Sequence, residues 1–277
     1  ILLTPESTPA LGHKIVVVKG YAPTYEKDGL SDGKKCERCG EWIEPQKVLP
    51  KLEDLPITVT SAINVETGIK VTWEPNEKAA AYCVVRKESG KSAVIINDST
   101  TGTTYIDTTA VPGVNYTYLV RALNAEGYIT SKYDLTKGKA VTRIECISVA
   151  LSNTTAGMQI SWKKAGGANG YYVYRKTDST SFVRIATISN ADTLSYVDKT
   201  AQNGVKYTYA VRGYNGSYLG AYKSKAYVRL TTPKINSLTK YDRTTLRVNY
   251  TQNTAASGYE IVYYVSKDAT RVKVENP

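Results

Sequence analysis

One sequence pattern occurs twice in this chain and begins a third time, and it constrains the fold more than any other feature. The first half of the pattern aligns at residues 68–73 (GIKVTW), 157–162 (GMQISW) and 245–250 (TLRVNY). The aromatic residue that ends each segment is followed nine positions later by a tyrosine: Tyr82, Tyr171 and Tyr259. The second half, GVNYTYLVR at residues 113–121, returns as GVKYTYAVR at residues 204–212. A fixed period of this kind indicates tandem domains rather than one large fold.

The period also predicts where the domains begin and end. Trp73 and Trp162 are 89 residues apart, and Trp162 and Tyr250 are 88 residues apart, in a chain of 277 residues. Only the first half of the pattern follows residue 232, so we expect the third copy to be partial. The predicted units are a small β module with a linker at 1–54, a first repeat at 55–143, a second repeat at 144–232 and a partial third repeat at 233–277. Residues 46–55, with Pro50 inside the segment and Pro45 and Pro56 on either side of it, are expected to form the linker to the first repeat.

Each repeat has the pattern of a β protein. Residues 69–73 (IKVTW) alternate apolar and polar side chains with a period of two, which is typical of a half-buried strand. Short runs rich in Val, Ile, Thr and Tyr are separated by turn residues such as those at 111–113 (VPG). Seven short strands in about 90 residues are the signature of two packed antiparallel sheets. We therefore predict an all-β fold built of tandem β-sandwiches.

The repeats resemble fibronectin type III domains, which are immunoglobulin-like sandwiches, of the kind found in Gram-positive bacterial surface proteins. The resemblance implies that Trp73 and Trp162 are the core tryptophans of strand B. It also implies that Tyr116 and Tyr207 are tyrosine corners at the start of strand F, whose hydroxyls bond to the backbone of the preceding turn. These four residues are the predicted structural sites.

The same interpretation assigns smaller structural contributions to two further tyrosines and to two aspartates. The hydroxyls of Tyr118 and Tyr209 are expected to need no fixed partner, so their loss should cost less than loss of the corner hydroxyls. Asp107 and Asp198 occupy equivalent positions in the two repeats, and we expect them to serve turns and strand ends.

The N-terminal unit contains the sharpest local motif, Cys-x-x-Cys-Gly at Cys36 and Cys39. Residues 12–41 resemble a small repeat of large secreted proteins from Gram-positive gut bacteria, which usually has Cys where this chain has Tyr25. Without metal, Cys36 and Cys39 form a local disulfide in an oxidising compartment or remain unreactive thiols. With metal, they bind zinc together with His13, the only histidine. A thioredoxin-like redox role would need a βαβ context, which the sequence lacks. We favour the interpretation without metal and expect no cofactor, because Tyr25 replaces a ligand that the related repeats would offer.

The charge of the chain indicates the partners that it could bind. The net charge is +11, and residues 144–232 hold 11 basic but only four acidic residues. A basic surface attracts polyanions, and exposed rings among the 23 tyrosines could stack on sugars. Because the chain has no dense Lys/Arg run, we expect no specific nucleic acid, and it has no apolar stretch long enough to span a membrane.

Catalysis is not expected. A single histidine leaves most acid–base and nucleophilic schemes without a base, so we predict no catalytic residues and no enzyme activity.

The predicted function is that of a monomeric, extracellular or cell-surface fragment that acts as a spacer, an adhesion module or a protein-interaction scaffold. Its partners would be a cell-wall polymer, a host glycan or a protein. The alternative is an accessory region, either a spacer or a carbohydrate-binding module, of a secreted glycoside hydrolase or another extracellular enzyme.

Overall fold

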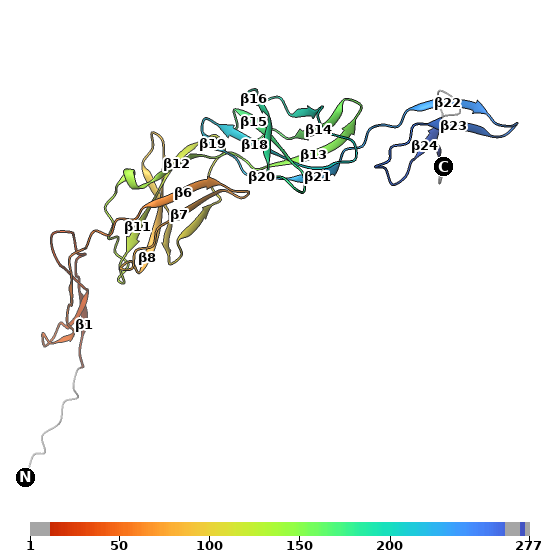
Figure 1. Cartoon of the computed structure of the whole chain (residues 1–277). Coiled ribbons are helices and arrows are strands. Elements are labelled where there is room, and N and C mark those ends of the chain that lie inside the picture. The colour runs from red at the N-terminus through yellow and green to blue at the C-terminus, as the bar shows by residue number, and fades with distance from the viewer. Residues whose placement is uncertain (1–11, 264–271, 275–277) are drawn as a thin grey trace, which may run out of the picture.

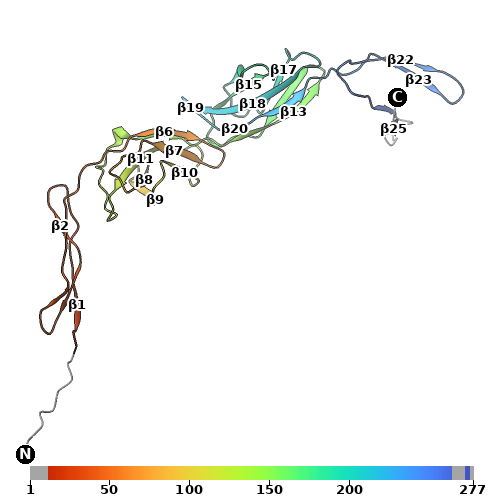
Figure 2. The ribbon, with the colours of Figure 1, turned by 60° about the horizontal axis from the view of Figure 1, so that its bottom comes forward.

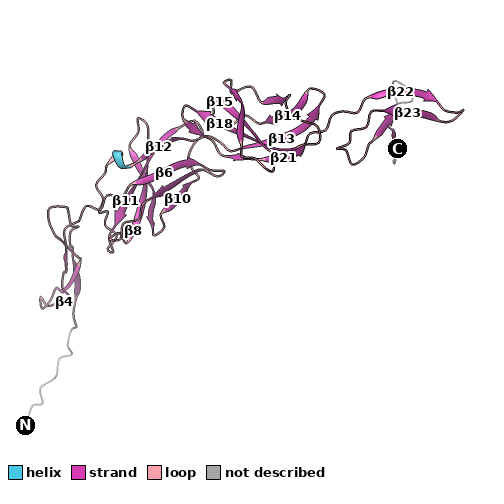
Figure 3. Cartoon of the chain, viewed as in Figure 1, coloured by secondary structure: helices cyan, strands magenta, loops and turns pink. Residues whose placement is uncertain are grey.

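The computed structural model describes residues 12–263 and 272–274, and in these residues the chain is built of strands joined by turns (Figure 3). The prediction of an all-β fold is confirmed. A single 3-10 turn, η1 (Leu135–Lys137), is present in this part of the chain. None of the helical segments described here has the length or apolar character needed to cross a membrane.

The first sandwich packs a three-stranded sheet against a four-stranded one, both antiparallel. The smaller sheet has the order β10-β7-β6 and the larger sheet the order β12-β11-β8-β9. In fibronectin type III terms these are strands E-B-A and G-F-C-C′. Their bounds are β6 (Val59–Asn64), β7 (Ile69–Trp73), β8 (Ala81–Glu88), β9 (Ala93–Thr100), β10 (Thr104–Asp107), β11 (Asn115–Leu123) and β12 (Lys139–Thr142).

The second sandwich repeats this order, with β17-β14-β13 facing β16-β15-β18 and with β21 paired to β18. It differs in a short strand, β20, which runs parallel to the start of β13, and in β19, which extends the hairpin after β18. The bounds are β13 (Ile147–Thr154), β14 (Gly157–Trp162), β15 (Gly170–Lys176), β16 (Val183–Ile188), β17 (Ser195–Asp198), β18 (Lys206–Asn215), β19 (Tyr218–Leu219), β20 (Tyr222–Lys223) and β21 (Lys225–Val228).

Each sandwich has its own hydrophobic core between its two sheets. Alternation with a period of two places Ile69, Val71 and Trp73 on the inner face of β7, and all three are buried. Trp73 packs edge-on against Tyr82, with ring centroids 5.7 Å apart, and Trp162 packs in the same way against Tyr171 at 5.3 Å. The nine-residue spacing of the aromatic residues in the sequence therefore corresponds to one packed Trp–Tyr pair in each core.

The tyrosine nine positions after each aromatic residue also has a polar role that recurs along the chain. The Tyr82 hydroxyl accepts a hydrogen bond from the backbone N–H of Asn76, 2.8 Å away, and Tyr171 accepts one from Ala165 at 3.3 Å. Tyr259 accepts the corresponding bond from Asn253. The ring thus fills the core while its hydroxyl ties down the turn between strands B and C.

The N-terminal module is a narrow unit of short strands. β1 (Ile15–Val18), β3 (Gly33–Cys36) and β4 (Trp42–Glu44) form one sheet, and β2 (Gly29–Leu30) pairs with β5 (Val48–Leu49). The segment expected to be a linker, residues 46–55, is more ordered than we predicted. It contains β5, and its last residue, Leu55, is buried in the core of the first sandwich. Backbone pairing and burial, rather than proline content, decide its conformation.

After residue 233 the chain forms two hairpins. β22 (Ile235–Lys240) pairs with β23 (Leu246–Tyr250), and β24 (Ile261–Tyr263) pairs with β25 (Val272–Val274). Residues 264–271 and 275–277 of the expected third repeat, and 1–11 of the expected N-terminal unit, lie outside the described residues. The division of the chain into four units remains a prediction.

The units follow one another in a row rather than packing side by side. Two views, differing by 60°, show the N-terminal module, the two sandwiches and the last hairpins in sequence order along an extended path (Figures 1 and 2). Neighbouring units therefore meet end to end, and the joints between them set the shape of the molecule.

Candidate functional site

The Cys-x-x-Cys-Gly motif forms a tight turn at the tip of the β3–β4 hairpin. The backbone N–H of Cys36 donates to the carbonyl of Glu41 at 2.8 Å, and the N–H of Gly40 donates to the carbonyl of Cys36 at 2.9 Å. Gly40 has a φ of 76°, a conformation that favours glycine because it has no Cβ. The motif thus carries the residue that its own turn requires.

This turn points backbone N–H groups at one sulfur. The Cys36 Sγ accepts hydrogen bonds from the N–H groups of Cys39 and Arg38. The bond from Cys39 is the largest influence and, with a contact to His13, outweighs burial, which acts in the opposite direction, so the pKa of the Cys36 thiol falls to about 6. Cys36 is buried, whereas Cys39 is exposed, and both are free cysteines.

The pairing of β1 with β3 brings His13 to this turn. Ile15 lies opposite Cys36 in the register, and the N–H of Glu37 donates to the carbonyl of Lys14 at 2.8 Å. His13 Nδ1 consequently lies 3.5 Å from the Sγ of Cys39. The potential ligand atoms of His13, Cys36 and Cys39 all lie within 4.8 Å of one another.

Tyr25 lies elsewhere, which corrects one argument from the sequence. Its hydroxyl donates to the carbonyl of Thr130 in the first sandwich at 2.9 Å, and Lys132 lies over its ring at 5.4 Å. The loop that carries Tyr25 is therefore at the end of the module that touches the sandwich, whereas Cys36 and Cys39 are at the opposite tip. Tyr25 therefore takes no ligand position away from the cysteines, because it lies at one end of the module and the two cysteines lie at the other.

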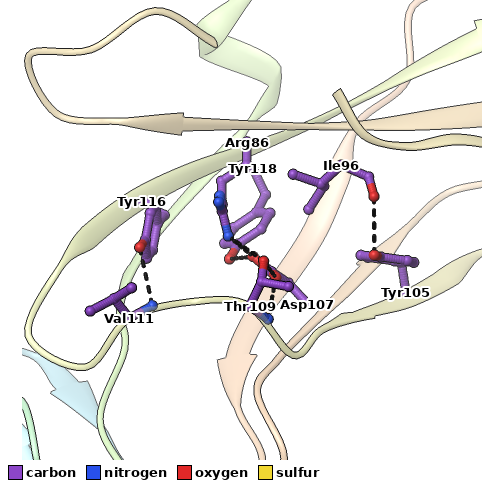
Figure 4. Close-up of polar contacts among 8 residues, drawn as sticks. All are labelled: Arg86, Ile96, Tyr105, Asp107, Thr109, Val111, Tyr116 and Tyr118. Atoms are coloured by element: carbon purple, nitrogen blue, oxygen red, sulfur yellow. Dashed lines mark hydrogen bonds and ion pairs between the residues drawn. The ribbon is translucent and has the colours of Figure 1, made fainter. Parts of the chain in front are cut away.

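Each sandwich buries one carboxylate in a polar cluster that the sequence did not predict, and Figure 4 shows the cluster of the first sandwich. In the first sandwich the Asp107 carboxylate accepts hydrogen bonds from Tyr118 at 2.6 Å, from Arg86 at 2.8 Å and from the hydroxyl of Thr109 at 2.7 Å. The second sandwich repeats the cluster with Asp198, Tyr209, Arg175 and Thr200.

These clusters correct the expectation that the Tyr118 and Tyr209 hydroxyls need no fixed partner. Both residues are fully buried, so a hydroxyl without a partner would be costly, and the carboxylate supplies that partner. The signal that could have predicted this arrangement is the repeat itself, since Arg86 and Arg175 occur 89 positions apart, in the same period as the tryptophans.

The environment of the two carboxylates keeps them ionised. Burial alone would raise the pKa of Asp107, but hydrogen bonds from Tyr118, Thr109 and Arg86 outweigh it and hold the pKa below its ordinary value. The same balance lowers the pKa of Asp198. Asp107 and Asp198 are each 1% exposed and are bonded to side chains of their own sandwich, an arrangement suited to holding the two sheets together.

The residues predicted as structural sites occupy the inner faces of the two sandwiches. Trp73 and Trp162 are 2% and 7% exposed. The Tyr116 hydroxyl accepts a hydrogen bond from the backbone N–H of Val111 at 3.1 Å (Figure 4), and Tyr207 accepts one from Gln202 at the same distance. Both tyrosines thereby hold the loop that crosses from one sheet to the other.

A polar clamp recurs where the chain leaves each sandwich. The Asn64 Oδ1 accepts from the backbone N–H of Ile144 at 2.9 Å and from Arg143 at 3.4 Å. In the second sandwich Asn153 accepts from the N–H of Leu230 at 3.0 Å and from Arg229 at 3.2 Å. Each clamp joins the end of strand A to the end of strand G.

The joints themselves also repeat. At the first joint the Gly113 N–H donates to the Arg143 carbonyl at 2.9 Å, and Gly113 lies against Gly167 of the next sandwich. At the second joint the Gly204 N–H donates to the Arg229 carbonyl at 2.8 Å, and Gly204 lies against Ala255. The same loops therefore meet at both joints.

The first joint carries further bonds across the boundary. Asn64 Nδ2 donates to the Leu219 carbonyl at 3.2 Å, and Glu66 forms an ion pair with Lys223. Beside the joint is an open cleft of about 760 Å³ whose lining includes Arg143, Cys146 and Lys164.

No family model and no curated protein matches this chain. Among solved structures it is similar to the FN1–FN3 domains of chicken CNTN1, with 14% identity, a TM-score of 0.30, and coverage of 74% of this chain and 78% of the other. It is also similar to a two-domain fibronectin type III segment of chicken tenascin, with 16% identity, a TM-score of 0.33, and coverage of 65% and 99% respectively. The fibronectin type III-like fold of the two sandwiches follows from the strand order and register described above.

Proposed function

We propose that this chain is a non-catalytic spacer and interaction scaffold of an extracellular surface protein, in which repeated joints hold consecutive sandwiches at set angles. The observation that carries the proposal is the recurrence of one joint at the two boundaries that follow the first and second sandwiches. A spacer with flexible linkers needs no such contacts, whereas a spacer of defined reach does.

The clamp supports this role because it removes freedom from the exit of each sandwich. Arg143 is 7% exposed, and its guanidinium also donates to its neighbour's carbonyl, that of Ile144, at 2.9 Å. Arg229 makes the equivalent bond to Leu230 at 2.8 Å. A guanidinium held by several acceptors fixes the direction in which the chain continues.

The resemblance of the repeats to fibronectin type III domains of bacterial surface proteins supports an extracellular location. An accessory region of a secreted glycoside hydrolase would use the same extended arrangement. A catalytic domain encoded beside this chain would assign it to that second role, and a wall-sorting signal would assign it to the first.

The outer face of the second sandwich supports a binding role beside the spacer role. Tyr172 and Tyr214 stack with ring centroids 4.4 Å apart, and Arg184 lies 4.7 Å over Tyr172. Arg212 lies 5.5 Å from the ring of Tyr222. A surface of rings and guanidinium groups fits an anionic glycan or cell-wall polymer, because the rings stack on sugars and the cations pair with acidic groups.

The joint can be tested at Gly167. A Cβ at this position would lie 2.3 Å from the Arg143 carbonyl oxygen and 2.5 Å from the Gly113 nitrogen. Gly167→Ala should therefore open the first joint. Gly90→Ala is the matched control, because Gly90 has a similar positive φ of 76° but no atom within 4 Å of the added Cβ.

The measurement is the distribution of distances between two spin labels, one in each sandwich, together with small-angle X-ray scattering. We expect a narrow distribution for the native chain and for Gly90→Ala, and a broad one for Gly167→Ala. A broad distribution in the native chain would contradict the proposal.

A further inference from the structure

We propose that His13, Cys36 and Cys39 bind one zinc ion at the tip of the N-terminal module, with the fourth coordination position open to solvent. This site is independent of the proposed spacer function. It rests on the arrangement of the three side chains and on the small size of the module's core.

The three ligand atoms are already close to the separations that zinc requires. Zn–S bonds of about 2.3 Å and Zn–N bonds of about 2.0 Å place tetrahedral ligand atoms about 3.5–3.8 Å apart. The Cys39 Sγ and His13 Nδ1 are 3.5 Å apart, and no pair in the cluster exceeds 4.8 Å. Small rotations about the side-chain bonds complete the geometry.

The backbone of the turn holds the two cysteines in place without a metal. The Cys36 N–H donates to the Glu41 carbonyl at 2.8 Å, and the Gly40 N–H donates to the Cys36 carbonyl at 2.9 Å. Gly40 closes the turn with a φ of 76°. The ligand side chains therefore project from a backbone that is already fixed.

The module needs a link of this kind because it buries little apolar surface. Ile15 and Val17 of β1 are 54% and 55% exposed, and Trp42 of β4 is 41% exposed. Units of this size that lack a hydrophobic core usually depend on a metal or on disulfides.

A disulfide between Cys36 and Cys39 would serve the module less well. It would close a loop with only two intervening residues, and the entropy gained from a crosslink grows with the length of the loop that it closes. A metal would also tie His13, 23 residues earlier in the chain, to the β3–β4 turn. It would thereby join the outer strand β1 to the hairpin tip.

The fourth position is left to a group from outside the cluster. In the part of the chain that the structure describes, no fourth His, Cys, Asp or Glu joins the three ligands. The neighbouring Glu37 carboxylate is held in an ion pair by Lys14. Because His13 and Cys39 are both exposed, water or another small ligand can reach the metal.

The test is a cobalt titration of the full chain, reduced and freed of metal with a chelator. We expect one equivalent of Co²⁺ to produce thiolate-to-metal charge-transfer and tetrahedral d–d bands, which one equivalent of Zn²⁺ then removes. Cys36→Ser and Cys39→Ser should each abolish tight binding, and His13→Asn should weaken it at least tenfold and change the d–d bands. Far-UV circular dichroism verifies that the sandwiches of each variant remain folded.

Two controls sharpen the result. Cys146→Ser changes a cysteine at the distant joint and should leave the titration unchanged. Tyr25→Cys should also leave it unchanged, because that side chain lies at the opposite end of the module. Absence of Co²⁺ binding by the reduced native chain, or binding that His13→Asn leaves unaltered, would overturn the proposal.

Discussion

The two sandwiches share their inner faces and differ on their outer faces. In both cores a tryptophan packs against a tyrosine in the same edge-on arrangement. The two tyrosines of strand F are also spaced alike, with ring centroids 6.2 Å apart for Tyr116 and Tyr118 and 6.0 Å apart for Tyr207 and Tyr209. The carboxylate clusters also correspond bond by bond. The shared contacts pack one sheet against the other, so both repeats need them.

The outer face of the larger sheet differs in composition between the two sandwiches. In the first sandwich it carries a buried apolar cluster of Cys83, Val85, Leu119 and Leu123. The equivalent positions of the second sandwich are Tyr172, Tyr174, Ala210 and Tyr214. The ring of Tyr172 contacts the rings of Tyr174 and Tyr214, and Arg184 lies over Tyr172. The fold tolerates this change because it depends on the inner faces, so the outer faces are where the two domains can acquire different partners.

The largest expected effect tests the shared core. Trp73→Ala and Trp162→Ala should each lower the free energy of unfolding of their own sandwich by about 3–5 kcal/mol, because each removes a buried ring and leaves a cavity. Denaturant melts of the full chain with a fluorescent reporter in each sandwich measure this loss. A loss below about 1 kcal/mol in either sandwich would show that the two cores are not equivalent.

The carboxylate clusters should rank second. Asp107→Ala and Asp198→Ala should each cost about 3 kcal/mol, because each leaves a partly buried arginine and a buried tyrosine hydroxyl without their acceptor. Asn substitutions at the same positions keep the shape of the side chain and should cost less. Melts at neutral pH measure both changes, and equal costs for Ala and Asn would contradict the role of the hydrogen bonds.

The same clusters predict an acid dependence of stability. The folded-state pKa values of Asp107 and Asp198 lie below their unfolded values, so the stabilisation is complete above the unfolded pKa of about 3.9 and is lost as the pH falls through the folded values. Melts between neutral and acidic pH should show a stability that declines only in the acidic range. The Asp107→Asn variant should decline less steeply, and an unchanged slope would contradict the prediction.

Tyrosine hydroxyls provide a finer test, in which the structure reverses the order expected from the sequence. Tyr118→Phe should cost about 1.5–3 kcal/mol because its hydroxyl donates to a charged carboxylate, and Tyr116→Phe about 1 kcal/mol because its partner is a neutral backbone N–H. The pair Tyr209→Phe and Tyr207→Phe should follow the same order. A greater loss for Tyr116→Phe would restore the original ranking.

The smallest effect on stability belongs to the outer face of the second sandwich. Arg184→Ala removes a cation from the half-buried ring of Tyr172 and should cost no more than about 0.5–1 kcal/mol. Retention on an immobilised anionic polysaccharide should fall, whereas Lys87→Ala on the corresponding sheet of the first sandwich should leave it unchanged. Equal losses for the two variants would show that net charge, and not this face, governs binding.

Much of the architecture could be predicted from residue spacing because strands and turns are encoded locally. The alternation at residues 69–73 shows which side chains face inward. The nine-residue interval from Trp73 to Tyr82 recurs in every copy because the two rings of the packed pair must lie at this spacing. The Cys-x-x-Cys-Gly turn is likewise local, since Gly40 supplies the conformation that closes it.

Only the tertiary structure showed which distant groups meet. Arg86 and Asp107 come from different sheets, and Asn64 and Arg143 are 79 residues apart in the sequence, so neither contact leaves a trace in short-range spacing. The strand register decided that His13 joins the cysteines while Tyr25 docks on the next domain. Local sequence thus determined the strands, turns and core rings of this protein, whereas the polar clusters, the joints and the composition of the candidate metal site arose from pairing between segments that are remote in the chain.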